Sequence, residues 1–202
     1  MSEITPAQIK ALRDATGAGM MDCKRALQEA DGDFDRAFEL LRERGQAQAQ
    51  KRADRAANQG LIDSYIHFNN TVGVLVEVNC ETDFVANTDE FRRLTKDVAL
   101  HVASPSAPRW LSREDVPAEV LEYHRQLFEA QAKESGKPDN VVPRIVDGKL
   151  EAFFKDNVLL EQPYVKDDKK TIRQLLDEVS AKVGEKVAVR RFVRYKLGED
   201  AS

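Results

Sequence analysis

The sequence is poor in the residues from which most metal and catalytic sites are built. It has three histidines and two cysteines in 202 residues. Cys23 and Cys80 are far apart, and neither has a second cysteine nearby to form a zinc-binding or redox pair. None of His67, His101 and His124 has metal-ligand spacing to another histidine or cysteine. We therefore expect packed or surface histidines, buried cysteines, and a protein without a metal or cofactor.

Catalytic motifs, long apolar runs and an excess of positive charge are also missing. No GxSxG motif occurs, and Gly17-Ala18-Gly19 is not a phosphate loop, because no strand precedes it and no GKS or GKT follows. No apolar run approaches the length of a membrane helix and no signal peptide is recognised, so we expect a cytoplasmic protein. A net charge of −4 argues against direct nucleic-acid binding. Together these absences predict a soluble protein that is not an enzyme.

Residues 1–45 predict a small bundle of three helices. Thr5 is a suitable N-cap, and Gln8 completes a capping box with it. Gly17-Ala18-Gly19 separates the first two helices, and Gly45 is a suitable C-cap for the third. Two stripes with the i, i+3, i+4, i+7 spacing of a buried helical face consist of Cys23, Ala26, Leu27 and Ala30, and of Phe34, Ala37, Phe38 and Leu41.

The remainder predicts a helical extension or linker over 46–58 and an α+β core over 59–202. Within the core, the run 61–68 and the alternating valines of 72–78 predict a β-hairpin in a small antiparallel sheet. A last β-rich run, 187–195, is a candidate third strand of that sheet. Two helices are expected to carry buried stripes at Phe91, Leu94, Val98 and Val102, and at Ile172, Leu175, Leu176, Val179 and Val183.

Between these helices the sequence predicts a projecting helical hairpin over about 114–157. Gly136-Lys137-Pro138 is expected to reverse the chain. The first helix is predicted to have a heptad seam at Val116, Val120, Tyr123, Leu127 and Ala130. The second is predicted to face it with Val142, Val146, Leu150 and Phe153.

One local feature combines an acidic residue with a large aromatic one. In Cys80-Glu81-Thr82-Asp83-Phe84-Val85, a valine-rich strand ends and a helix approaches. Such a junction can present Phe84 as a wedge to a partner. Alternatively, Phe84 packs under the sheet while Asp83 caps the next turn. The residue types alone favour packing, because aromatic side chains are more often buried than exposed.

Two stretches resemble the elongation factor Ts family. The first is Leu12-Arg13 followed by Thr16-Gly17-Ala18-Gly19-Met20-Met21-Asp22-Cys23-Lys24, and the second is Glu77-Val78-Asn79-Cys80-Glu81-Thr82-Asp83-Phe84-Val85. Weaker similarity continues through 135–138, 162–165 and 192–195, so the resemblance covers essentially the whole chain.

The resemblance implies a guanine nucleotide exchange factor of translation elongation, which binds elongation factor Tu with GDP and promotes GDP release so that GTP can bind. In the family, the segment corresponding to Thr82, Asp83, Phe84 and Val85 is implicated in displacing Mg²⁺ from the partner's nucleotide site. The N-terminal bundle resembles the ubiquitin-associated (UBA) fold and, in the family, docks on the partner's nucleotide-binding domain. The candidates for that contact are Leu12, Met20 and Met21, with the bundle's own core as their alternative role.

Many family members carry two copies of the sheet-containing core, whereas this sequence shows one. A second copy of the chain is then a candidate for the missing half, which makes homodimerisation a hypothesis. The main alternative function is an adaptor whose helical bundle binds ubiquitin-like or other proteins. That alternative leaves the Thr82–Val85 segment, and everything after it, without a purpose.

Overall fold

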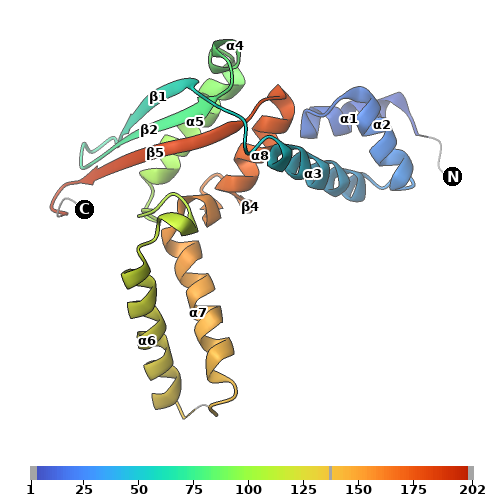
Figure 1. The fold of residues 1–202 in the computed structure, drawn as a ribbon. Coiled ribbons are helices and arrows are strands. Elements are labelled where there is room, and N and C mark those ends of the chain that lie inside the picture. Colours follow the sequence, from blue (N-terminus) through green and yellow to red (C-terminus); the bar gives the residue numbers. More distant parts are fainter. Residues whose placement is uncertain (1–3, 137, 200–202) are drawn as a thin grey trace. The chain divides into compact units, whose positions relative to one another are not determined.

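The computed structural model describes residues 4–136 and 138–199 and has an α+β architecture, as the sequence predicts (Figure 1). The contacts between Cα atoms divide the chain into two compact units. The first unit consists of Met1–Ile62, Glu77–Thr95 and Gln174–Arg190, and the second unit consists of Asp63–Val76, Lys96–Arg173 and Arg191–Ser202. Among the described residues, no helix is both long enough and apolar enough to cross a membrane.

A helical bundle opens the first unit. Its first helix, α1 (Pro6–Thr16), begins with the predicted capping box: the Thr5 hydroxyl accepts from the N–H of Gln8 at 3.3 Å, and Gln8 Oε1 accepts from the N–H of Thr5 at 2.9 Å. The helix ends at Gly17, whose φ of 70° is the left-handed conformation that favours glycine. The core of the bundle consists of Leu12, Cys23, Ala26, Leu27, Ala30, Ala37 and Leu41.

The second and third helices of the bundle are α2 (Met20–Glu29) and α3 (Phe34–Lys51). Asp33 caps α3, because its carboxylate accepts a hydrogen bond of 3.0 Å from the N–H of Arg36. The buried residues of α2 follow the predicted stripe, and Ala37, Phe38 and Leu41 of α3 pack into the core as predicted, but Phe34, at the start of α3, is 39% exposed, so its predicted burial is wrong. The bundle of three helices is therefore confirmed, while its likeness to the UBA fold stays a prediction.

Gly45 is not the C-cap of the third helix, which continues to Lys51, so of the two alternatives predicted for 46–58 the structure has the helical extension in the first part. The residues after Gly45 are mostly alanine and glutamine, which favour a helix over a break. Gly45 faces α8 (Ile172–Val183) instead: a Cβ atom placed on it stands 3.3 Å from the side chain of Ala181. The extension expected within 46–58 is thus helical for its first part, and the predicted domain limits stay a prediction.

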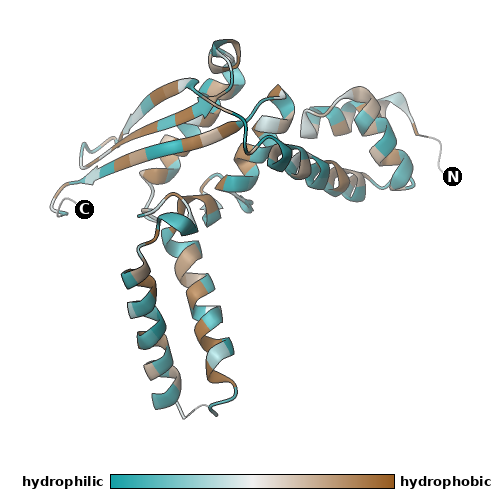
Figure 2. Cartoon of the chain, in the orientation of Figure 1, coloured by the Kyte–Doolittle hydropathy of each residue, from teal (hydrophilic) through white to brown (hydrophobic). Residues whose placement is uncertain are grey.

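The sheet contains β1 (Gln59–Ile66), β2 (Val72–Cys80) and β5 (Val187–Lys196), with β2 in the middle. The N–H of His67 donates to the carbonyl of Val72 at 2.9 Å, which closes the hairpin between β1 and β2. Hydrophobic and hydrophilic residues alternate along the strands (Figure 2), and the alternate valines of β2 are buried. The predicted hairpin and last strand are both confirmed.

Two helices bury most of their predicted apolar stripes, with Leu175 and Val183 of the second stripe only partly buried. α5 (Asp89–Val102) begins after Thr88, whose Oγ1 accepts from the N–H of Phe91 at 3.3 Å. α8 begins directly after Thr171. The buried apolar residues are Phe91, Leu94, Val98, Ala99 and Val102 in α5 and Ile172, Leu176 and Val179 in α8. A single helical turn, α4 (Asp83–Ala86), lies between β2 and α5.

The predicted helical hairpin belongs to the second unit and consists of α6 (Ala118–Glu134) and α7 (Val142–Asn157), which run antiparallel (Figure 1). Of the predicted reversal at Gly136-Lys137-Pro138, Lys137 lies outside the described residues. The buried residues between the two helices are Ala132, Val142, Val146 and Leu150, and Phe128, Ile145 and Phe154 pack against them.

The heptad seam predicted for α6 is wrong beyond its first two residues. Tyr123 is 63% exposed and Leu127 is 36% exposed, so neither faces α7. A neighbouring stripe, His124, Phe128 and Ala132, takes that position, and the His124 ring lies 4.4 Å from that of Phe153. Two apolar stripes overlap in this helix, and a histidine is not counted as apolar although its flat ring packs well against phenylalanine.

A two-stranded sheet, β3 (Pro163–Tyr164) and β4 (Asp167–Thr171), has no counterpart in the sequence prediction. Both strands are short, and β4 consists mostly of aspartate and lysine, which are depleted in strands. Two 3₁₀ turns, η1 (Arg113–Asp115) and η2 (Leu159–Glu161), flank the helical hairpin.

Arg113 joins the two 3₁₀ turns to the second helix of the hairpin. Its guanidinium donates to both carboxylate oxygens of Glu151, at 2.7 and 2.6 Å, and also to Glu161. The same group lies 4.3 Å from the centre of the Phe154 ring. A planar guanidinium that is forked to two carboxylates and stacked on an aromatic ring holds a defined orientation. Arg113 therefore fixes the start of α6 relative to α7.

Candidate functional site

The segment Thr82–Val85 forms a single helical turn that is closed by side chains at both ends. Thr82 is the N-cap, with its Oγ1 accepting from the N–H of Val85 at 3.4 Å. At the other end, the side-chain amide of Asn87 donates to the carbonyl of Asp83 at 2.9 Å, and the hydroxyl of Thr88 donates to the carbonyl of Val85 at 2.7 Å. The turn therefore has partners for the backbone groups that so short a helix leaves open.

Phe84 points into solvent from this turn and is 82% exposed. Packing of Phe84 under the sheet, which the residue type favoured, is therefore wrong, and so is capping by Asp83, since Thr82 is the cap. Ala86 is the residue of the turn that is buried. A large apolar ring held in water has burial free energy to gain from a partner, about 1.5–3 kcal/mol for a side chain of this size.

The carboxylate of Glu185 holds the residues that precede the turn. Glu185 lies between α8 and β5, 103 residues along the chain from Thr82. Its Oε2 accepts hydrogen bonds from the N–H groups of Glu81 at 3.1 Å and Thr82 at 3.0 Å. Its Oε1 accepts a third, of 2.7 Å, from the hydroxyl of Thr82. The end of β2 is thereby attached to the start of β5 by side-chain bonds.

A second carboxylate makes the same connection in the opposite direction. Oε1 of Glu81 accepts from the N–H of Lys186 at 2.6 Å and from the guanidinium of Arg55 at 3.2 Å. The hydrogen bond from Lys186 is the main reason that the pKa of Glu81 lies below its ordinary value. The ammonium group of Lys186 donates in turn to the carbonyls of Ala53 and Arg55, at 2.6 and 2.9 Å. Segments from three parts of the first unit meet here.

Cys80 is a structural part of this site. The side chain is fully buried, and its thiol donates to the carbonyl of Thr82 at 3.1 Å. Burial, followed by the nearby negative charge of Glu185, raises the pKa of the thiol to about 11. Since the thiolate is the nucleophilic form, Cys80 is unreactive at neutral pH.

The three candidates for N-terminal docking have different environments. Leu12 is fully buried in the core of the bundle and is therefore not accessible to a partner. Met20 and Met21, at the start of α2, are 54% and 67% exposed. Two adjacent exposed methionines form an apolar surface that adapts readily to another protein. The structure thus separates Leu12, which has the alternative core role, from the two methionines.

The histidines occupy packed or partly exposed positions, in line with the packed or surface histidines that the sequence predicts. His101 is fully buried, and the ring of His124 lies among the phenylalanines of the helical hairpin. His67 is half-buried, and its Nδ1 lies 3.1 Å from the hydroxyl of Tyr65. Within residues 4–136 and 138–199, no group of three or more His, Cys, Asp or Glu side chains is arranged to hold a metal ion.

The family resemblance predicts Thr82–Val85 as a contact segment, but nothing in the sequence predicts the residues that hold the turn. Glu81 lies inside the motif, yet no role was assigned to its carboxylate. Glu185, Lys186 and Arg55 lie far from the motif in the chain and match no pattern of spacing. The pairing of β2 with both of its neighbours, β1 and β5, brings them together, and a single sequence does not specify which backbone groups then meet.

Comparison with known proteins assigns the chain to a family. The family model described as "Elongation factor TS" matches residues 27–199. Elongation factor Ts of Thermoanaerobacter sp. (strain X514) is 55% identical over 196 residues, which cover 97% of this chain and 96% of that protein. Elongation factor Ts of Caldanaerobacter subterraneus subsp. tengcongensis is 54% identical, with coverages of 97% and 98%. That of Fervidobacterium nodosum is 51% identical over 197 residues, with coverages of 98% and 100%. The chain belongs to the elongation factor Ts family.

Proposed function

We propose that the chain is a guanine nucleotide exchange factor that acts on elongation factor Tu. It binds the GDP form of that protein, displaces Mg²⁺ and promotes the release of GDP, so that GTP binds next. The observation that carries the proposal is the turn at Thr82–Val85, which holds an exposed Phe84 on a framework of hydrogen bonds. Membership of the elongation factor Ts family supports the identity of the partner.

The physical basis of such exchange is thermodynamic linkage. A GTPase that holds GDP with nanomolar affinity has about 12 kcal/mol of binding free energy. An exchange factor that binds the nucleotide-free form more tightly than the GDP form weakens GDP binding by the same coupling free energy. The factor therefore needs contacts that only the nucleotide-free conformation permits, and it needs no reacting group of its own.

Phe84 and Asp83 supply such contacts together. The Phe84 ring enters between packed elements near the Mg²⁺ site of the partner, and packed cores respond to such an insertion by switching between discrete arrangements. Loss of Mg²⁺ then removes the largest local positive charge that holds the GDP phosphates. Asp83, which is also exposed, places a carboxylate beside the ring. Thr82 and Val85 complete the contact surface and hold its shape.

The N-terminal bundle supplies affinity through Met20 and Met21. Both side chains are exposed at the start of α2 and have no role in the bundle core. Contacts that are equally strong with every nucleotide state of the partner increase affinity without changing the release rate. Docking and displacement are thus separate tasks, performed by different residues of the first unit.

A second copy of the chain covers an apolar face of the hairpin between β1 and β2. In the second unit, Ile66 and Leu75 are 60% and 49% exposed, and Phe68 at the turn is 87% exposed. The Cδ1 atom of Ile66 lies 3.1 Å from a Cβ atom placed on Gly73. Ile66, Gly73 and Leu75 therefore share the face opposite to the buried valines of β2. Association of two such faces forms the homodimer. Nucleic acid is not a direct partner of the chain in this proposal.

The test is the release of a fluorescent GDP analogue from elongation factor Tu, followed by stopped flow in excess Mg²⁺. We expect the wild-type chain to accelerate release and Phe84→Ala to do so far less. Equal acceleration by both would place the displacing contact elsewhere. No acceleration by the wild type would refute the function and favour an adaptor that binds other proteins through its helical bundle.

A further inference from the structure

The Glu185 carboxylate binds the backbone directly before the turn that carries Phe84. Its three hydrogen bonds reach two consecutive residues, Glu81 and Thr82, and use both oxygens. Hydrogen bonds that involve a carboxylate are shorter and stronger than those between neutral groups. Thr82 is bound through its N–H and its hydroxyl, so both its backbone position and its side-chain rotamer are fixed.

The turn itself has little stability of its own. α4 has four residues, and an isolated helix of that length does not form in water, because nucleation fixes several dihedral angles for a single hydrogen bond. Burial of the Phe84 ring does not offset this cost of nucleation, since the ring is 82% exposed. The conformation of the turn is therefore determined by its attachments, and the attachment on its N-terminal side is Glu185.

The connection runs in both directions. Glu185 accepts from the N–H groups at Glu81 and Thr82, while the Glu81 carboxylate accepts from the N–H of Lys186. Each carboxylate thus binds the backbone of the segment that carries the other. A slip of either segment by one residue would break both sets of bonds, so the pair fixes the register between the end of β2 and the start of β5.

We propose that Glu185 is a positioning residue for nucleotide exchange: it holds Thr82, and thereby sets the direction in which Phe84 meets the partner. The proposal rests on the proposed function of Phe84. Without Glu185, residues 81–84 sample many conformations, and only a fraction of molecules present the ring correctly. The free energy needed to restrict the turn to the binding conformation then reduces the free energy available for displacing Mg²⁺ and GDP.

The experiment measures GDP release from elongation factor Tu over a range of concentrations of the full chain. It yields a maximal rate, which reports displacement, and a half-saturating concentration, which reports docking. For Glu185→Ala we expect a maximal rate lower by about tenfold or more, since each hydrogen bond to a charged group is worth on the order of a factor of ten. The half-saturating concentration should change little, because Met20 and Met21 are untouched.

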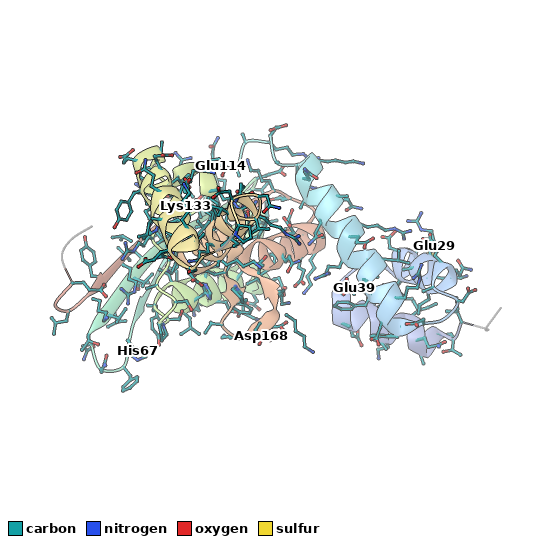
Figure 3. The ribbon with its side chains drawn as sticks, turned by 90° about the horizontal axis from the view of Figure 1, so that it is seen from below. Glu29, Glu39, His67, Glu114, Lys133 and Asp168 are labelled. Atoms are coloured by element: carbon teal, nitrogen blue, oxygen red, sulfur yellow. The ribbon has the colours of Figure 1, made fainter. Side chains whose placement is uncertain are left out.

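Glu185→Gln is the conservative variant. The glutamine oxygen can accept from the two N–H groups, and its amide can donate to the Thr82 hydroxyl, so all three bonds can form without the charge. We expect this variant to keep most of the maximal rate. The control is Asp168→Ala, which removes an exposed carboxylate from β4 in the second unit (Figure 3) and should leave the rate unchanged.

A double variant tests whether Glu185 acts through Phe84. If it does, adding Glu185→Ala to Phe84→Ala causes no further loss of maximal rate. Losses that multiply would show that Glu185 contributes independently of the ring and would overturn the positioning role. An unchanged maximal rate for Glu185→Ala alone would overturn it as well.

Amide hydrogen exchange of the free chain separates this proposal from the proposed function. Glu185→Ala should remove protection at the amides of Glu81, Thr82 and Val85, while the buried helix α5 keeps its protection. Retained protection at these three amides would refute the positioning role of Glu185, even if the wild-type chain releases GDP from elongation factor Tu rapidly. If Glu185→Ala loses this protection but the wild-type chain fails to release GDP, the proposed function is refuted, while Glu185 still holds the turn.

Discussion

The Nε2–H of His101 donates a hydrogen bond of 2.9 Å to Oε1 of Gln162, and both side chains are buried. Nδ1 of His101 accepts from the N–H of Val165 at 3.2 Å, which fixes the neutral tautomer with its proton on Nε2. The Gln162 amide donates to the carbonyls of Ser106 and Asp156 at 2.9 and 2.8 Å. These bonds join the end of α5, the end of α7 and the small sheet within the second unit.

This arrangement predicts a loss of stability in mild acid. Burial lowers the pKa of His101 below its ordinary value of 6.5, and the bond to Gln162 opposes that shift only in part. Below about pH 6.5 the unfolded chain binds a proton here that the folded chain does not bind, so unfolding becomes easier as the pH falls. Urea unfolding at about pH 8 and about pH 5.5 should show a free energy of unfolding that decreases with acidification.

The control for this prediction is His101→Gln, which removes the titrating group. Its free energy of unfolding should be lower than that of the wild type at high pH, because part of the buried network is lost. Its further decrease on acidification should be smaller than the decrease of the wild type. An equal decrease in the two proteins would assign the acid sensitivity to other groups.

The N-terminal residues should separate into a core residue and docking residues. Leu12→Ala is expected to destabilise the chain by about 2–5 kcal/mol, since it leaves a cavity at a fully buried position. Replacing Met20 and Met21 by alanine should change stability by less than about 1 kcal/mol but raise the half-saturating concentration in GDP release. A double methionine variant that docks normally would remove these residues from the proposed interface.

What could be predicted from the sequence was mostly local. The capping box at Thr5 and Gln8 lies within one helical turn, and the alternation of valines in β2 lies within one strand. Such signals depend on residues close in the chain, so they can be recognised without knowing which helices or strands pack against the segment. The bundle, the β-hairpin and most of the helical stripes are therefore confirmed, and the stripe of α6 and the place of Phe34 in that of α3 are the exceptions.

The errors concern choices made by tertiary contacts. The seam of α6 passes through His124 and Phe128 because these rings fit against α7, whereas Tyr123 looked equally suitable in the sequence. Phe84 is exposed although its residue type favours the core. The attachment of Thr82 to Glu185 spans 103 residues, and no pattern along the chain connects two such distant positions.

The cysteines should be inert in the folded chain. Burial is the main cause that raises the pKa of Cys80 to about 11 and that also raises the pKa of Cys23. At neutral pH far less than about one molecule in a thousand carries the Cys80 thiolate, and the side chain is closed to solvent. A chromogenic disulfide reagent should react with neither cysteine until guanidinium unfolds the chain, after which both should react. Rapid labelling of the native chain would contradict the burial of these residues.

The apolar face of the β1–β2 hairpin gives the last prediction. A charged side chain at the centre of that face prevents its burial against a second copy, because an unpaired carboxylate keeps its hydration only in water. Leu75→Asp should therefore convert a dimer at micromolar concentration into a monomer, as measured by sedimentation equilibrium.

Leu127→Asp is the matched control, since Leu127 is also a partly exposed leucine but lies on α6, away from α7. The same chemical change there should leave the mass of the dimer unaltered. If both variants are monomeric, the change in net charge and not the face is responsible.

A wild-type chain that is already monomeric at micromolar concentration would refute the homodimer, and the exposed Ile66, Phe68 and Leu75 would then be surfaces for elongation factor Tu itself. In that case Leu75→Asp would slow GDP release directly. If the face is instead a dimer contact, Leu75→Asp would alter GDP release only by converting the dimer into a monomer.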